Sequence, residues 1–152
     1  AKYDFSAPVF VERLLVVFHK SNRVDFIGHT SLFGKRVGVL RGWSYGDEFD
    51  KAVKEGKILA DEVDSDSQNF QRLAARRIDA MITTREVIDP AVRSGKLSDI
   101  EVAPIPLQEN EGFLAFSKTA NQKDALNKIN LAIESMRKSG RLTKIAEVEL
   151  NR

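Results

Sequence analysis

The sequence predicts an α/β fold in which a mostly parallel sheet is flanked by helices. Short runs rich in valine, isoleucine and leucine are typical of buried strands. They alternate with segments whose apolar residues recur at three and four positions, which is the spacing of an amphipathic helix. Because strands that alternate with helices form right-handed crossovers, we expect helices on both faces of the sheet.

The first predicted strand is Leu14–Phe18, a continuous apolar run that a polar turn follows. The second is Arg36–Leu40, a β-branched run that ends in a glycine turn. A helix is predicted over Tyr45–Glu55, because its apolar residues recur at helical spacing and Gly56 is a natural C-terminal stop.

Two further pairs of strand and helix continue this pattern. The strand Ile58–Val63 precedes Asp64–Ser67, which offers several N-cap candidates for the next helix. The strand Ile78–Ile82 precedes Thr83 and Thr84, which are placed to cap a third helix.

The last part of the chain is predicted to hold two extended segments and two helices. The segment Ile100–Ile105 looks extended, and Pro104–Pro106 indicates a linker or hinge. A further strand is predicted over Glu111–Ser117. The closing helices are Asp124–Lys138 and Leu142–Leu150, with Gly140 between them.

The composition is that of one ordinary globular domain. The 152 residues are 42% hydrophobic and 30% charged, and 24 basic against 22 acidic residues leave a net charge of +2. This charge is too small and too evenly spread to indicate a nucleic-acid partner. No cysteine is present, which excludes disulfides, thiolate metal sites and a cysteine nucleophile.

Signals for the membrane and for export are weak in this sequence. No run approaches the ~20 apolar residues of a membrane span. The opening Ala1–Ser6 has no basic start followed by an apolar stretch, so we expect that a signal peptide is absent or has been removed.

The strongest candidate for a binding site is the turn that follows Arg36–Leu40. In open α/β sheets, ligands bind beyond the carboxyl ends of the strands, where loops lead into helices. Gly42 permits a tight turn, Trp43 and Tyr45 flank Ser44, and Ser44 adds a hydroxyl. Free N–H groups at a helix start suit a carboxylate or phosphate. The alternative is that Ser44 only caps the helix while Trp43 packs on the surface.

A second candidate lies at the end of the strand Ile78–Ile82. Thr83 and Thr84 would point into the same crevice if the two strands are neighbours in one sheet, and the charge of Arg85 could reach a ligand. The alternative is again helix capping for the threonines and solvation for the arginine.

The sequence favours a binding protein over an enzyme. His19 and His29 are the only histidines, and neither has the spacing from carboxylates that metal ligation requires. The acidic pairs Asp47–Glu48 and Asp61–Glu62 are explained by solvation, and no nucleophile-elbow or phosphate-loop pattern occurs. We therefore expect no catalytic residue, no metal and no cofactor.

Five phrases of the sequence, in order, match the pattern of one protein family. They are Tyr3–Phe10, similar to Phe-Ser-x-Pro-Tyr; Leu32–Val39, similar to Leu-x-Gly-Lys-x-Val-Gly-Val; Gly42–Tyr45, similar to Gly-Thr-Ser/Thr-Tyr; Arg77–Ala80, similar to Gly-Arg-x-Asp-Ala; and the returning strand Gly112–Lys118. The chain thus resembles family 3 of the bacterial extracellular solute-binding proteins, which serve polar amino acid importers.

This resemblance implies a two-lobed periplasmic binding fold of type II that closes on its ligand. Residues 1–12 would cross from a first lobe whose opening part this sequence lacks. Residues 13–108 would form the second, ligand-binding lobe, and residues 109–152 the return strand and helices of the first lobe. The expected function is to capture an amino acid or related carboxylate for an ABC permease, in the periplasm or another extracytoplasmic location.

The resemblance also assigns roles within the candidate site. Ser44 and the amides near Trp43 would bind a carboxylate. Thr84 stands where amino acid binders commonly carry an aspartate that pairs with the α-amino group. A neutral hydroxyl cannot offset a buried ammonium as a carboxylate can. The ligand therefore lacks an α-amino group, or another residue holds it.

Two alternatives stay open on the same scaffold, and one association is expected. The chain could be the sensory domain of a membrane receptor such as a histidine kinase, or a dehydratase-like enzyme. Because Ile129, Leu131, Ile133 and Ile145 need cover, we expect two chains to form a homodimer through the C-terminal elements.

Overall fold

The computed structural model describes residues 2–93, 95, 98–120 and 122–150, which form two compact units. Unit 1 comprises residues 1–12 and 110–152, and unit 2 comprises residues 13–109. Which lobe of a larger protein each unit represents stays a prediction.

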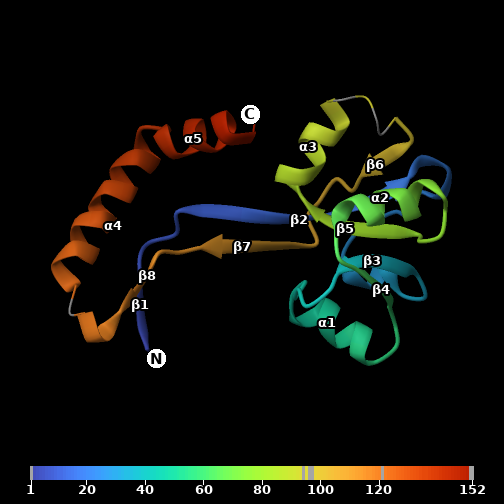
Figure 1. The fold of residues 1–152 in the computed structure, drawn as a ribbon, viewed down its shortest axis with the longest axis horizontal. Coiled ribbons are helices and arrows are strands. Elements are labelled where there is room, and N and C mark those ends of the chain that lie inside the picture. The colour runs from blue at the N-terminus through green and yellow to red at the C-terminus, as the bar shows by residue number, and fades with distance from the viewer. Residues whose placement is uncertain (1, 94, 96–97, 121, 151–152) are drawn as a thin grey trace. The chain divides into compact units, whose positions relative to one another are not determined.

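Unit 2 is built on a mixed sheet with the strand order β4-β3-β5-β2-β6 (Figure 1). Its strands are β2 (Phe10–His19, which begins in unit 1), β3 (Arg36–Leu40), β4 (Leu59–Val63), β5 (Ala80–Thr84) and β6 (Ile100–Val102). Its helices are α1 (Asp47–Lys54), α2 (Asp66–Ala74) and α3 (Arg85–Arg93), with 3-10 turns at Lys20–Asn22 and His29–Leu32.

Four strands of this sheet run in one direction. Strand β3 pairs in parallel with both β4 and β5, while β2 lies antiparallel between β5 and β6. The register places Leu14 opposite Thr84 and Val37 opposite Ala80. The predicted α/β class with a mostly parallel sheet is confirmed, and β2 is the antiparallel exception.

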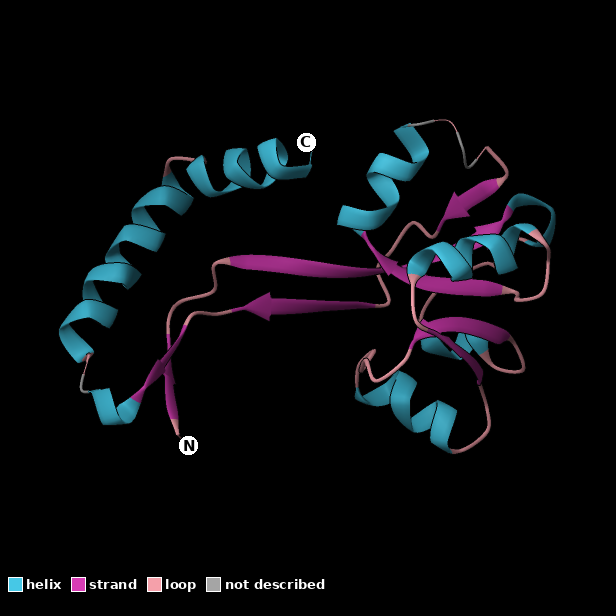
Figure 2. Ribbon diagram, in the orientation of Figure 1, coloured by secondary structure: helices cyan, strands magenta, loops and turns pink. Residues whose placement is uncertain are grey.

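The alternation of side chains along β2 divides the core of unit 2 into two clusters. Leu14, Val16 and Phe18 pack in one cluster with residues of α1, whereas Leu15 and Val17 pack in the other with residues of α2 and α3. The five side chains are at most 3% exposed. The sheet is therefore covered on both faces, α1 lying on one side and α2 and α3 on the other (Figure 2).

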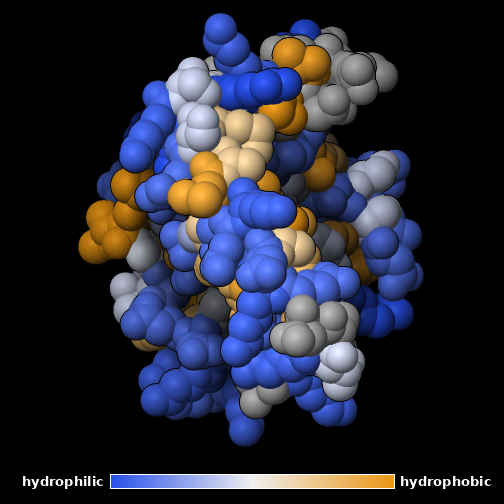
Figure 3. Space-filling model, turned by 90° about the vertical axis from the view of Figure 1, so that its left-hand side faces the viewer, coloured by the Kyte–Doolittle hydropathy of each residue, from blue (hydrophilic) through white to orange (hydrophobic). Residues whose placement is uncertain are grey.

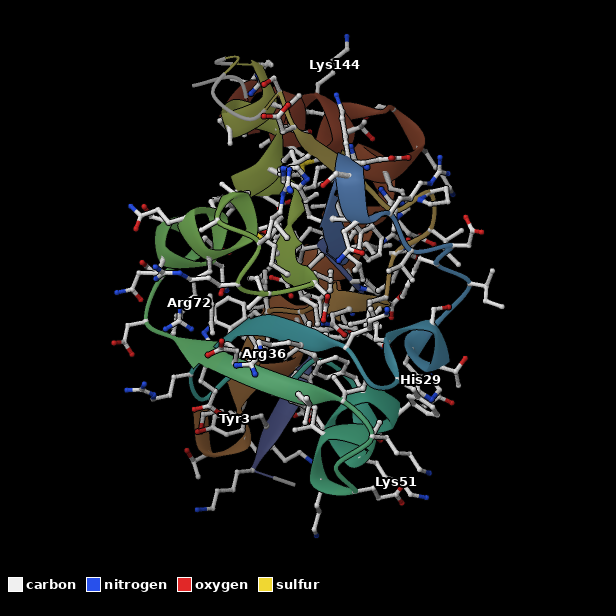
Figure 4. All side chains as sticks on the ribbon, turned by 90° about the vertical axis from the view of Figure 1, so that its right-hand side faces the viewer. Tyr3, His29, Arg36, Lys51, Arg72 and Lys144 are labelled. Atoms are coloured by element: carbon white, nitrogen blue, oxygen red, sulfur yellow. The ribbon has the colours of Figure 1, made fainter. Side chains whose placement is uncertain are left out.

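Local signals set several of the element boundaries. Ser65 caps α2 by accepting a hydrogen bond from the Gln68 amide, as one of the predicted candidates. Gly56 follows α1 with a φ of 71°, a left-handed conformation that glycine adopts readily. On the other side of the sheet, Arg72 of α2 and Arg36 of β3 both form ion pairs with Asp61 (Figure 4).

Unit 1 contains a two-stranded antiparallel sheet and two helices. Strand β1 (Tyr3–Phe5) pairs with β8 (Ala115–Ser117), and a 3-10 turn, Lys118–Ala120, follows. Helix α4 (Lys123–Lys138) is separated from α5 (Arg141–Leu150) by Gly140, as predicted. Strand β7 (Gln108–Gly112), which crosses the unit boundary, pairs with β2.

Apolar side chains of unit 1 remain in solvent. Figure 3, which views the left-hand side of Figure 1, shows hydrophobic residues among hydrophilic ones. Leu131 is 67% exposed and Ile145 is 49% exposed, in agreement with the expectation that they lack cover. Ile133, in contrast, is buried at 3% exposure and needs no further partner.

Candidate functional site

The candidate site lies where the connections of the sheet diverge. The chain leaves β3 through α1 to reach β4, its neighbour on one side, and then returns through α2 to β5, its neighbour on the other side. The carboxyl ends of β3 and β5 thus meet at a topological switch point, which is the usual ligand position in open α/β sheets. The predicted segment Gly42–Tyr45 follows the end of β3 after one residue. The predicted segment Thr83–Arg85 contains the last two residues of β5 and the first residue of α3.

The turn after β3 is exposed and depends on glycine. Gly42 has a φ of 77°, which disfavours other residues, and nothing fills the space beside its Cα atom. The Trp43 amide donates a hydrogen bond of 3.3 Å to the Leu40 carbonyl, which closes the turn. The Trp43 side chain is 52% exposed, so the indole is available to a ligand.

Ser44 is tied to helix α1 by an aspartate. Its hydroxyl donates to Asp50 Oδ2 at 2.5 Å, and the Tyr45 amide donates to Asp50 Oδ1 at 3.1 Å. Helix α1 has no side-chain cap at its N-cap residue, Gly46. The Asp50 carboxylate therefore organises the turn that leads into the helix.

Tyr45 differs from its neighbours because its side chain belongs to the core. It is 4% exposed, and its ring contacts Phe49 edge-on with centroids 5.6 Å apart. Its hydroxyl oxygen accepts a hydrogen bond of 2.7 Å from the Leu40 amide. Burial raises the pKa of the Tyr45 phenol, the Leu40 hydrogen bond lowers it, and the negative charges of Asp66, Asp50 and Glu62 raise it further. Through this burial and this hydrogen bond, the Tyr45 side chain stabilises the turn.

The second segment places its three residues in three different environments. Thr83 is buried, and its hydroxyl donates to Asp66 Oδ1 at 2.8 Å. Thr84 ends β5 half-buried, and no side-chain partner is found for its hydroxyl among the described residues. Arg85 is exposed and forms an ion pair with Asp89 at 3.6 Å. Both threonines end the strand, and helix α3 begins at Arg85.

The structure thus brings together the carboxyl ends of β3 and β5, as the sequence predicts, and adds residues that the sequence analysis did not assign to the site. Asp50 was not singled out, and Asp66 was considered only as a helix cap. Arg41 pairs with Glu62 and Asp64, which ties the end of β3 to the end of β4. Whether the predicted residues bind a ligand stays a prediction.

Other kinds of site find little support in the described part of the chain. No group of three or more potential metal-binding side chains occurs among the described residues. No described helix is both long and apolar enough to cross a membrane. His19 accepts a hydrogen bond from the Ser21 amide, and Nδ1 of His29 lies 3.0 Å from a carboxylate oxygen of Glu48. The hydroxyls of Ser44 and Thr83 are held by carboxylates and not by histidine.

Comparison with known proteins shows amino-acid-binding relatives, although no family model matches the chain. The L-cystine-binding protein TcyJ of Escherichia coli strain K12 is 29% identical over 147 residues, which cover 96% of this chain and 53% of that protein. The probable amino-acid-binding protein YxeM of Bacillus subtilis is 24% identical over 149 residues, which cover 98% of this chain and 56% of that protein.

A solved structure of another amino-acid-binding protein is similar to this chain in both sequence and fold. An ancestral arginine-binding protein bound to arginine is 29% identical, with a TM-score of 0.68, and the match covers 95% of this chain and 63% of that one. The predicted periplasmic binding fold is thereby confirmed, as is the resemblance to bacterial solute-binding proteins. The chain spans about half the length of the curated relatives that it matches.

Proposed function

We propose that this chain is the ligand-binding part of an extracytoplasmic solute-binding protein that captures a small polar solute for an ABC importer. The observation that carries the proposal is the match to two amino-acid-binding proteins along almost the whole chain. The solute is an amino acid or a related carboxylate, and it binds at the switch point between β3 and β5. The partner is a membrane permease of the same importer.

The geometry of the switch point suits binding without chemistry. It offers an exposed indole at Trp43, a hydroxyl at Ser44 and a second hydroxyl at Thr84. Such a mixture of aromatic surface and a few polar groups is typical of small-molecule sites. The residues that we propose as ligand contacts are Gly42, Trp43, Ser44, Tyr45 through its backbone, Thr83, Thr84 and Arg85.

Trp43 provides a direct test because it is the only tryptophan of the chain. A solute that binds at the turn after β3 changes the environment of this indole, so titration with a panel of amino acids and organic acids should change its fluorescence saturably. Ser44→Ala and Thr84→Ala should each weaken binding of the responding solute by about 1 to 2 kcal/mol, because each removes a hydroxyl hydrogen bond.

The control for these variants is Ser139→Ala, which removes an exposed hydroxyl after α4 in unit 1. It should leave the affinity unchanged. Unchanged affinity in both Ser44→Ala and Thr84→Ala would refute the site, and a panel without any saturable response would refute the proposed function.

Experiments with the identified solute distinguish an importer component from a receptor domain and from an enzyme. Deleting the gene from the source cells should abolish uptake of that solute. Retained uptake with loss of a cellular response would favour the receptor alternative. The solute should be recovered chemically unchanged after incubation with the protein, and a new product would favour the dehydratase-like alternative.

The dimer remains a further proposal about unit 1. Leu131, Ile145 and Val148 on its two helices are between 49% and 67% exposed, and a second copy is one way to cover them. Light scattering should then give twice the mass of the chain. A strictly monomeric species at all concentrations tested would overturn it.

A further inference from the structure

We infer that unit 2 carries a second binding site, on the surface of helix α2, and that its ligand is a phosphate group. The site is a hollow of about 180 Å³ lined by Gln68, Gln71, Arg72 and Arg77. This volume is smaller than the ~300 to 1,000 Å³ of most sites for organic ligands, so it suits a small ion. The hollow shares no lining residue with the segments Gly42–Tyr45 and Thr83–Arg85, so the inference goes beyond the proposed function and does not depend on it.

The polar groups that helix α2 offers to the hollow are hydrogen-bond donors. Gln68, Gln71 and Arg72 recur at a spacing of three and four residues, which places them on one face of the helix. Gln68 Oε1 accepts a hydrogen bond of 3.0 Å from the Asp64 amide, so its Nε2 group is left with two hydrogens. Arg72 Nη1 donates to Asp61 Oδ1 at 2.6 Å, which uses one of the five N–H groups of this guanidinium.

The turn that ends α2 brings a second arginine back to the hollow. The Arg76 amide donates to the Leu73 carbonyl at 3.0 Å, and the Arg77 amide donates to the Arg72 carbonyl at 2.8 Å. Together with the left-handed φ of 58° at Arg76, these two bonds form a Schellman motif. The backbone of Arg77 is therefore bonded to that of Arg72, and both side chains line the hollow.

The positive charge at the hollow is only partly neutralised. The Asp61 carboxylate is shared by two arginines, Arg72 at 2.6 Å and Arg36 at 4.0 Å (Figure 4). Arg77 is exposed and has no ion pair among the described residues. Asp79 does not line the hollow, and its carboxylate accepts a hydrogen bond from the Arg36 amide at 2.8 Å. The described lining of the hollow thus holds two cations and no anion.

A phosphate group matches this set of donors. It carries a charge of about −1.5 to −2 at neutral pH and has more acceptor oxygens than a carboxylate. Arginine binds phosphate through two parallel N–H···O bonds, so Arg72 and Arg77 can hold different oxygens of one phosphate. The amide of Gln68 supplies a further donor.

The residue that forms the turn supports the inference. Among the described residues, Arg76 is the one non-glycine residue with a positive φ. Glycine is the usual residue at this position of a Schellman motif, and residues in strained conformations are common at functional sites. The side chain of Arg76 is exposed and adds a positive charge next to Arg77 in the sequence. An arginine at this position favours an anion more than it favours the turn.

Inorganic phosphate tests the site without knowledge of the natural ligand. Sodium phosphate is titrated into the protein at neutral pH, with sodium chloride adjusted to keep the ionic strength constant, and side-chain N–H signals are followed by NMR. The Nε–H signals of Arg72 and Arg77 and the amide signals of Gln68 should shift saturably. Shifts that do not saturate, or that are no larger than those of the other arginines, would overturn the inference.

Two variants in the lining should weaken the binding of inorganic phosphate. Arg77→Gln should lower the affinity by about tenfold, because it loses charge-assisted hydrogen bonds to the ligand. Gln71→Glu should abolish binding, because it places a negative charge at the hollow. Both positions are exposed, so both variants should fold, which a dispersed NMR spectrum verifies. Unchanged affinity in both variants would refute the site.

Lys54→Gln is the matched control for Arg77→Gln. Lys54 carries the same charge, is exposed, and lies in the last turn of α1, with no side-chain partner among the described residues. Its replacement should change the phosphate affinity by less than about twofold, because exposed charges at a distance are screened. An equal effect of the two variants would mean that only the overall charge attracts phosphate, which would overturn the specific role of Arg77.

Vesicles distinguish a lipid headgroup from a free phosphate. Flotation compares phosphatidylcholine vesicles with and without phosphatidic acid. Binding that requires phosphatidic acid, is lost in Arg77→Gln and is displaced by inorganic phosphate would identify a headgroup. Saturable NMR shifts with inorganic phosphate and no vesicle binding would identify a free phosphate or a soluble phosphate ester. Vesicle binding that Arg77→Gln leaves unchanged would contradict the inference.

Discussion

Unit 2 buries apolar side chains on both faces of its sheet, whereas Ile133 is the only apolar side chain of unit 1 that is buried among the described residues. In unit 2, Phe18 and Ile82 are 1% exposed and lie in a cluster packed against α1. In unit 1, Phe5 is 58% exposed and Leu131 is 67% exposed. Because stability follows the apolar area removed from water, unit 2 should hold most of the free energy of unfolding of this chain. Unit 1 needs additional cover to reach a comparable stability.

The largest expected effect comes from truncating one phenylalanine in each unit. Phe18→Ala should lower the free energy of unfolding by about 3 to 5 kcal/mol, because it leaves a cavity in a closed core. Phe5→Ala should cost about 1 kcal/mol, since it loses only partial burial and an edge-on contact with Phe113. Urea denaturation followed by circular dichroism measures both. Equal losses would contradict the difference between the units.

A pair of glycines tests the same comparison through packing. A Cβ atom at Gly38 would overlap the buried side chains of Asn69 and Ile78, whereas one at Gly112 would overlap the ring of Phe10, which is 58% exposed. Gly38→Ala should therefore cost about 1 to 3 kcal/mol. Gly112→Ala should cost less, because the Phe10 ring can move into solvent.

The Gly38 effect can be assigned to its neighbour by a double-mutant cycle. The Asn69 amide is fully buried and has no hydrogen-bond partner among the described residues. Asn69→Ala should relieve the overlap, so the two substitutions together should cost less than the sum of the single ones by at least about 0.5 kcal/mol. Strict additivity in urea denaturation would show that Asn69 is not the obstacle.

Tyr45 links the core of unit 2 to the candidate site through its hydroxyl. Tyr45→Phe should lower the free energy of unfolding by about 1 to 2 kcal/mol, because the Leu40 amide loses its acceptor. The pKa of the phenol is raised in the folded state, so the protonated form is favoured there. Stability should hold below pH 10, where both states are protonated, and should fall as the pH rises towards the folded-state pKa. Tyr45→Phe should lack the part of this alkaline decrease that Tyr45 causes, which denaturation at a series of pH values measures.

The smallest expected effect is a gain in stability. Arg76 follows α2 with a φ of 58°, which is strained for a residue with a Cβ atom. Arg76→Gly should raise the free energy of unfolding by up to about 1 kcal/mol. Arg77→Gly is the control, because Arg77 has no positive φ and should lose stability. A loss in Arg76→Gly as well would mean that its side chain contributes more than the strain costs.

Short-range patterns in the sequence predicted most elements of unit 2. The strand Arg36–Leu40 has the predicted bounds, and α1, β4 and β5 differ from prediction by a few residues. The extension of β2 back to Phe10 was missed, because Phe10–Arg13 lacks the apolar run that marks Leu14–Phe18. The antiparallel direction of β2 was also not predicted, since it depends on pairings with β5 and β6 that lie far along the chain.

The sequence indicated where the segments of the candidate site lie along the chain, but not the side-chain hydrogen bonds within it. The glycine turn and the ends of two predicted strands indicate where Gly42–Tyr45 and Thr83–Thr84 lie, because turns and strand ends depend on residues that are close in the sequence. The bonds from Ser44 to Asp50 and from Thr83 to Asp66 depend on the path of the backbone between the partners. Tyr45 was predicted as a ligand contact, and its burial follows from the same path, which turns its ring towards Phe49.

The insertion of unit 2 into unit 1 has a consequence for synthesis on the ribosome. Residues 13–109 are contiguous, so they can leave the exit tunnel and fold while the chain is still growing. Unit 1 cannot do so, because its strand β1 pairs with β8, where Tyr3 meets Ser117. Strand β1 cannot pair with β8 until more than a hundred later residues have been made. A chaperone or secretion factor that meets the nascent chain would find β1 without its partner strand β8 throughout that interval.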